Sequence, residues 1–88
     1  MNKTKGVNDS IKEIMELLSQ IENDYTVPTN VRSGVKFAYT ALSDHEKSLA
    51  VRVDKSLQEL DEISDDPNIP IYTRTQIWNV VSMLESLE

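Results

Sequence analysis

The 88-residue chain contains no cysteine, one histidine and only two glycines, and these scarcities exclude several kinds of site. Without cysteine there is no disulfide, no thiol nucleophile and no cysteine-based zinc or iron–sulfur centre. His45 alone cannot supply a site that needs two imidazoles. Two glycines, Gly6 and Gly34, cannot build a loop that cradles phosphate. We therefore expect a protein that is not an enzyme, with no catalytic, cofactor-binding or metal-binding residues.

Positive charge and long apolar runs are also scarce. Nine Lys and Arg residues oppose 15 Asp and Glu residues, which gives a net charge of −6 and argues against binding to a nucleic-acid backbone or an anionic membrane. No run of 18 apolar residues exists, and no apolar segment follows Lys3 and Lys5, so we expect neither a membrane span nor a signal peptide. The expected location is cytoplasmic. The length predicts one domain over 9–88 after a flexible N-terminus, 1–8.

Apolar residues recur with the period of an α-helix along most of the chain. The first predicted helix shows this spacing in its apolar stripe, which consists of Ile11, Ile14, Leu18 and Ile21. It begins near Asp9 or Ser10 and ends at 22–24; the others are predicted over 29–42, 47–64 and 72–87. No sustained alternation of period two predicts a strand. The expected fold is therefore all-α, with four antiparallel helices in two hairpins, 9–42 and 47–87.

The two hairpins match each other when the sequence is shifted by 42 residues. Six of 32 aligned pairs are identical, where chance would give about two. The identical pairs are Leu18/Leu60, Ile21/Ile63, Asp24/Asp66, Pro28/Pro70, Arg32/Arg74 and Leu42/Leu84. This agreement predicts two helix–turn–helix repeats with a period of 42. The alternative is two amphipathic hairpins that resemble each other by accident.

Two resemblances to known families follow from these residues. The segments Asp24…Val31-Arg32 and Asp66…Thr73-Arg74 resemble the turns of HEAT-type repeats, which implies a scaffold for protein contacts. Residues 61–78, DEISDDPNIPIYTRTQIW, resemble a small archaeal family, number one hundred and forty-seven among the uncharacterised protein families. That resemblance implies a short, all-helical, cytoplasmic archaeal protein. It implies no activity, cofactor or catalytic residue.

The residues matched at the turns are candidate structural anchors, namely Asp24, Pro28, Arg32, Asp66, Pro70 and Arg74. Each arginine could recognise a carboxylate or phosphate of a ligand. Alternatively, each could reach back to its own turn, near Asp24 or Asp66, and bind the carbonyls left unpaired there, because a guanidinium suits such forked contacts. The symmetric repetition at a turn favours the second interpretation.

The last predicted helix is apolar over much of its circumference. Such a helix is buried on more than one side. In one interpretation it is the central helix of the bundle and packs on the second and third helices. In the other, part of its surface contacts a second copy of the chain, as a homodimer, or a larger protein assembly. The candidate interface residues are Trp78, Val80, Met83 and Leu87.

The remaining polar residues predict no reaction. An acidic set is interpreted as a solvated surface; it comprises Asp54, Glu59, Asp61, Glu62, Asp65 and Asp66. His45 is expected to be exposed in a polar linker. The leading hypothesis is a non-enzymatic protein–protein interaction or scaffold module that acts through the last helix. The alternative is an accessory of RNA or translation machinery that uses Arg32, Arg52 and Arg74 as a cationic stripe, which the net charge of −6 opposes.

Overall fold

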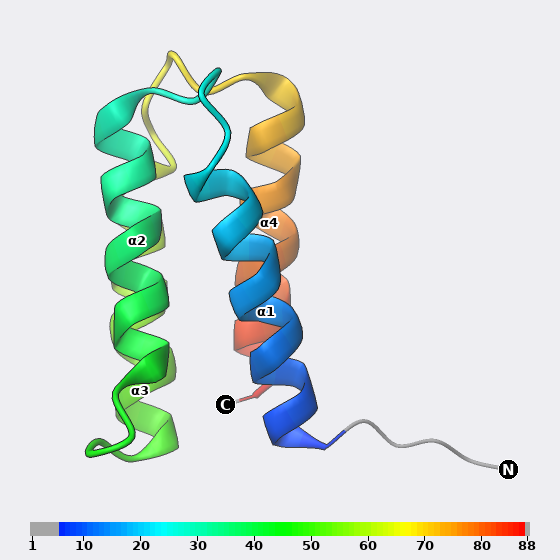
Figure 1. Ribbon diagram of the computed structural model, residues 1–88, viewed down its shortest axis with the longest axis vertical. Coiled ribbons are helices and arrows are strands. Elements are labelled where there is room, and N and C mark those ends of the chain that lie inside the picture. The colour runs from blue at the N-terminus through cyan, green and yellow to red at the C-terminus, as the bar shows by residue number, and fades with distance from the viewer. Residues whose placement is uncertain (1–5, 88) are drawn as a thin grey trace, which may run out of the picture.

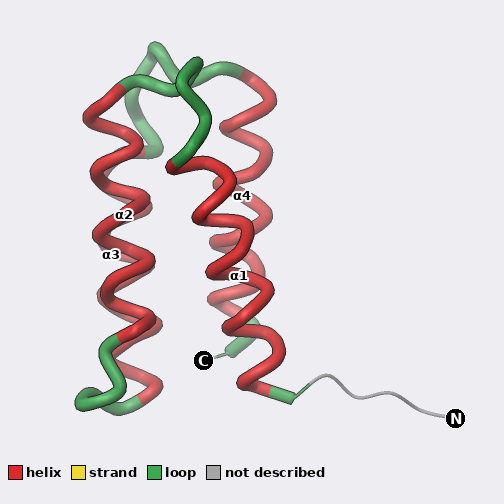
Figure 2. Tube along the Cα trace, viewed as in Figure 1, coloured by secondary structure: helices red, strands yellow, loops and turns green. Residues whose placement is uncertain are grey.

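The computed structural model describes residues 6–87, which form four helices joined by short corners (Figures 1 and 2). The helices are α1 (Val7–Glu22), α2 (Thr29–Ser43), α3 (Leu49–Ile63) and α4 (Ile71–Glu85). No strand occurs within residues 6–87, so the predicted all-α class is confirmed. None of the helices in this range is long and apolar enough to cross a membrane.

The helices form a closed ring in which each packs on two others. Successive helices run in alternate directions, and α1 returns to contact α4 (Figure 1). The prediction that the last helix packs on the second and third is wrong for the second: α4 packs on α1 and α3, and α2 lies diagonally opposite. Closure by an α1–α4 contact is the arrangement of a four-helix bundle. HEAT-type stacking stays a prediction.

The first helix begins earlier than its sequence suggested. Gly6, in an extended conformation, occupies the N-cap position, and its lack of a side chain means that no side chain caps the helix. Asp9 therefore lies in the first turn instead of capping it, where its charge favours the positive end of the helix dipole. Of the N-terminus predicted to be flexible, residues 1–5 lie outside the described range, whereas Val7 and Asn8 are helical.

The core is a single cluster of aliphatic side chains at the centre of the ring. Its largest fully buried members are Ile14, Leu18, Ile21, Leu42, Leu60, Ile77 and Leu84. Several positions matched by the 42-residue shift are buried alike, including Val35/Ile77, Ala38/Val80 and Leu42/Leu84. The burial pattern supports the predicted repeat, while superposition of the two halves stays a prediction.

A close approach of two helices explains the glycine within α2. Gly34 is buried, and a Cβ built on it would overlap Cγ2 of Ile63 at the end of α3. A second contact between these helices lies nearby, where the buried Ser56 hydroxyl donates a 2.8 Å hydrogen bond to the carbonyl of Ala38. Helices α2 and α3 can approach this closely because small residues face each other along the contact.

Candidate functional site

The three corners between helices share one construction. Each contains an aspartate within three residues of the end of the preceding helix, and a carboxylate oxygen of that aspartate accepts the backbone N–H of the residue two positions later. These contacts join Asp24 to Thr26 (3.0 Å), Asp44 to Glu46 (3.2 Å) and Asp66 to Asn68 (2.8 Å). The carbonyl of each aspartate also accepts the N–H three positions later. Each corner is therefore an Asx turn that fixes the path of the chain into the next helix.

An arginine stands eight residues after each of these aspartates and reaches back to the corner. Arg74 donates from Nη1 to the carbonyl of Ser64 (2.8 Å) and from Nη2 to the carbonyl of Asp66 (3.0 Å). Ser64 is the C-cap of α3, where backbone carbonyls have no helical partner. The guanidinium fork thus joins the end of α3 to the second turn of α4.

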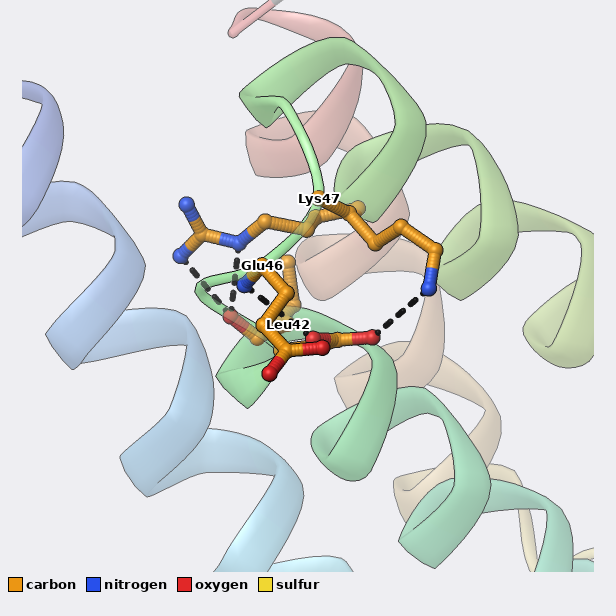
Figure 3. Close-up of polar contacts among 5 residues, drawn as sticks. Leu42, Glu46 and Lys47 are labelled. Atoms are coloured by element: carbon orange, nitrogen blue, oxygen red, sulfur yellow. Dashed lines mark hydrogen bonds and ion pairs between the residues drawn. The ribbon is translucent and has the colours of Figure 1, made fainter.

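The middle corner, at the opposite end of the bundle (Figure 1), also has an arginine that binds a backbone carbonyl (Figure 3). Arg52 donates from Nε (3.0 Å) and from Nη2 (2.8 Å) to the carbonyl of Leu42, in the last turn of α2. The exposed Lys47 also forms an ion pair with Asp44, with 3.2 Å between Nζ and Oδ2. A cation near the end of α2 also opposes the negative end of its helix dipole.

The first corner departs from the other two in the partners of its arginine. Arg32 donates from Nε to the carbonyl of Val27 (3.1 Å) and from Nη2 to Oγ1 of Thr29 (3.3 Å). Its guanidinium lies over the ring of Tyr25, 5.1 Å from the ring centroid. This stacking is a cation–π contact. Arg32 therefore stabilises its own corner through the turn and its aromatic residue.

Sequence reasoning missed the middle corner. A shift of 42 residues compares only the outer two corners, so Asp44 and Arg52 have no counterpart in that comparison. The detectable signal is the spacing of eight residues between aspartate and arginine, which occurs at 24/32, 44/52 and 66/74. In all three corners the arginine guanidinium donates to a backbone carbonyl, whereas the aspartate carboxylate accepts a hydrogen bond from a turn N–H.

Hydrogen bonds to the charged carboxylates lower the pKa of all three corner aspartates. The Thr26 hydroxyl is the main cause for the pKa of Asp24, and the Lys47 ammonium for that of Asp44. For Asp66 the main cause of the lowered pKa is the side-chain amide of Asn30, at 2.7 Å. Turn N–H groups lower each pKa further. The Asn30 contact also ties the start of α2 to the corner before α4.

The outer side of α4 carries large apolar side chains that the bundle does not cover. The Trp78 side chain is 62% exposed and that of Ile71 is 85% exposed. Beside Trp78, an open groove of about 370 Å³ runs between α3 and α4. Its apolar lining comprises Leu57, Leu60, Ile77, Trp78 and Val81. Exposed apolar side chains over such a groove are a feature of interaction surfaces.

The four predicted interface residues do not form one surface. Val80 is fully buried in the core and cannot contact a partner, which corrects the expectation for this residue. Met83 and Leu87 are half-buried against the core. Trp78 alone among them is largely exposed, and its neighbours in the groove are residues of α3 together with Ile77, Val81 and Glu85 of α4.

The ionisable side chains of the described residues do not gather into a metal-binding group. Within residues 6–87 no group of three or more histidine, aspartate and glutamate side chains is placed to hold a metal ion. His45 is exposed at the middle corner, beside a groove of about 490 Å³ that Ile11, Met15 and Tyr39 also line. All three arginines are engaged at corners. The geometry therefore offers the apolar surface on α4 as the candidate site.

Comparison with known proteins places the chain in a family. The relatives include proteins from Sulfurisphaera tokodaii (46% identity over 89% of this chain and 88% of the relative) and Aeropyrum pernix (41% over 99% and 96%), both called "UPF0147 protein". The crystal structure of "unknown function protein MMP1188" matches with 45% identity and a TM-score of 0.95 over 99% of each chain. A Thermoplasma acidophilum crystal structure matches with 37% identity and a TM-score of 0.87, over 92% of this chain and 95% of the other. The model of the uncharacterised protein family UPF0147 matches residues 1–87, and the chain belongs to that family.

Proposed function

We propose that the protein is a non-enzymatic protein–protein interaction or scaffold module that acts through the outer side of α4. The observation that carries this proposal is the exposure of Trp78 beside the apolar groove between α3 and α4. Tryptophan is enriched at the centres of protein interfaces, where burial of its large ring contributes much of the affinity. Because 62% of Trp78 is exposed, the bundle itself uses only part of the apolar surface that the ring could bury.

In a solution of the purified protein, the available partner is a second copy of the chain, so the proposal predicts a homodimer. Each copy carries a net charge of −6, so association through α4 brings like charges together. Salt screens this repulsion, and we expect homodimer formation to increase with ionic strength. Sedimentation velocity across micromolar concentrations, at low and high salt, measures the fraction of dimer.

Two variants locate the contact. Trp78→Ala should weaken dimer formation, whereas Phe37→Ala, which removes a ring of similar exposure (59%) from α2, should leave it unchanged. A strictly monomeric protein at every salt concentration would contradict the dimer. Equal effects of the two substitutions would contradict the assignment to α4.

The alternative role in RNA or translation machinery depends on a cationic stripe. The α1–α2 and α3–α4 corners lie at one end of the bundle and the α2–α3 corner at the other (Figure 1). Arg32 and Arg74 bind at the first two corners and Arg52 at the third, and all three donate hydrogen bonds within the protein. An electrostatic site for a phosphate backbone needs clustered cations that are available to it. The arrangement therefore favours the interaction module. RNA affinity that rises steeply as salt falls would reverse this preference.

A further inference from the structure

The groove beside Trp78 lies between two adjacent helices, which is a position that suits a third helix. Its lining residues on α3 fall within 57–64 and those on α4 within 77–85, which corresponds to about 10–12 Å of groove. A furrow between two adjacent helices accepts the side-chain ridge of another helix. An amphipathic helix would place residues three, four and seven positions apart on this apolar floor.

The charged side chains of the groove have one sign. Among its described lining residues, Asp61 on α3 and Glu85 on α4 carry charge, and both are exposed. Gln58 and Ser64 complete the polar rim. An occupant with basic residues beside its apolar stripe would pair with Asp61 and Glu85, whereas a second copy of this acidic chain would bring the same two carboxylates to the contact.

From this complementarity we infer that the preferred occupant is a basic amphipathic helix of another protein, which displaces the second copy when it is present. This inference rests on the proposed function and names the chemistry of the partner at the same surface. The apolar floor supplies affinity, and Asp61 and Glu85 supply the preference for a basic partner.

The chain contains a single tryptophan, so the fluorescence of Trp78 reports directly on the groove. The probe is a synthetic helical peptide without aromatic residues, with leucines at positions i, i+3 or i+4 and i+7, and lysines flanking the stripe. A matched peptide carries glutamates instead of lysines. We expect the lysine peptide to shift the Trp78 emission to shorter wavelength and to bind about tenfold more tightly than the glutamate peptide, an advantage that salt reduces.

Charge reversal tests the role of the rim. The double variant Asp61→Lys/Glu85→Lys should reverse the preference and bind the glutamate peptide more tightly. Phe37→Ala, on α2, should bind both peptides as the unchanged protein does. Both substituted rim positions are exposed, so the double variant is expected to fold.

The outcomes separate this inference from the proposed function. Equal binding of the two peptides, or an unchanged preference in the double variant, would overturn the assignment of a basic partner. If neither peptide binds while the protein dimerises through Trp78, the occupant is a second copy, and the inference fails although the proposed function stands. If neither peptide binds and the protein stays monomeric, both fail.

Discussion

Two hydroxyl groups are buried in this small core, and only one of them has a hydrogen-bond partner. Ser56 donates to the carbonyl of Ala38, whereas Oγ1 of Thr73 has no partner among the described residues. Thr73 matches Val31 in the predicted repeat, and a valine has nearly the same shape as a threonine. Because a buried hydroxyl without a partner costs free energy, Thr73→Val should raise the free energy of unfolding by about 1 kcal/mol.

Denaturant unfolding followed by circular dichroism measures this change. Ser56→Ala is the matched control, since it removes a buried hydroxyl that is bonded, and it should lower the free energy of unfolding by about 1 kcal/mol. A loss of stability in Thr73→Val similar to that in Ser56→Ala would show that the threonine hydroxyl is satisfied.

Gly34 gives a second prediction at the scale of one residue. Alanine favours a helix interior over glycine by about 1 kcal/mol, yet a Cβ at this position would overlap Cγ2 of Ile63. We expect Gly34→Ala to lower the free energy of unfolding by about 1–3 kcal/mol, because overpacking forces the helices apart.

A double-mutant cycle in the same unfolding assay tests whether Gly34 and Ile63 approach each other closely. Ile63→Ala removes the overlapping Cγ2, so Gly34→Ala should cost much less in that background. Ser33→Ala, at the adjacent exposed position of α2, controls for helix propensity. Additive effects of Gly34→Ala and Ile63→Ala would contradict the close approach.

At the residue scale, the sequence predicted burial better than it predicted contacts. The stripe of Ile11, Ile14, Leu18 and Ile21 is buried as its spacing predicted, because a period of 3.6 residues fixes which side chains share a face. From the sequence alone, Gly34 can be described only as a residue of low helix propensity. Its role depends on Ile63, which lies in another helix, and no local pattern contains that information.

At the scale of elements, the corners are the best-defined units of the molecule. Each joins an Asx turn to an arginine that binds carbonyls at the end of the preceding helix or within the turn. The outer two could be predicted from the proline and arginine that they share. The middle one lacks these shared marks, because Ser48 replaces the proline at the N-cap and Lys47 replaces the buried Val27 or Ile69, so only the eight-residue spacing from aspartate to arginine indicates it.

The contribution of a corner can be measured at Arg74. Its replacement by methionine keeps much of the apolar stem but leaves the carbonyls of Ser64 and Asp66 without their donor, and it should lower the free energy of unfolding by about 1–2 kcal/mol. Arg74→Lys should recover little of this loss, because one ammonium does not reproduce the fork.

Lys55→Met serves as the control for loss of a cation, since Lys55 is exposed on α3 and has no hydrogen bond to other described residues. Its unfolding midpoint should stay close to that of the unchanged protein. Full recovery of stability in Arg74→Lys would show that charge alone stabilises the corner.

At the scale of the whole molecule, the identity of neighbouring helices could not be predicted from periodicity. The pattern of α4 indicated a helix that is apolar on more than one side, and the bundle covers only part of that surface. Helix periodicity predicts which face of a helix is buried, but it does not predict which other helix covers that face. The ring, with α1 on α4, leaves Trp78 outside. Of the candidate interface residues, Trp78 is therefore exposed, whereas Val80 lies on the core side of the same helix.

The corner aspartates stand at both ends of the bundle and give the molecule a common dependence on acid. Their pKa values in the folded protein are lower than the 3.8 of an unperturbed aspartate, so their stabilisation is fully present above that pH. It is lost as the pH falls through the lowered values, because protonation removes the charge that the turn donors bind. The free energy of unfolding should therefore stay nearly level from neutral pH to about 4 and then decrease.

Two triple variants with the same change of net charge test this origin of acid sensitivity. Asp24→Asn/Asp44→Asn/Asp66→Asn keeps a side-chain acceptor at each corner but removes the titrating group, so its unfolding midpoint should vary less below about pH 4. Asp54→Asn/Asp61→Asn/Asp65→Asn changes exposed carboxylates that accept no backbone N–H from the described residues, and it should keep the acid dependence of the unchanged protein. Chemical denaturation at a series of pH values, followed by circular dichroism, distinguishes them. An equal loss of acid dependence in both variants would assign the effect to the overall negative charge instead of the corners.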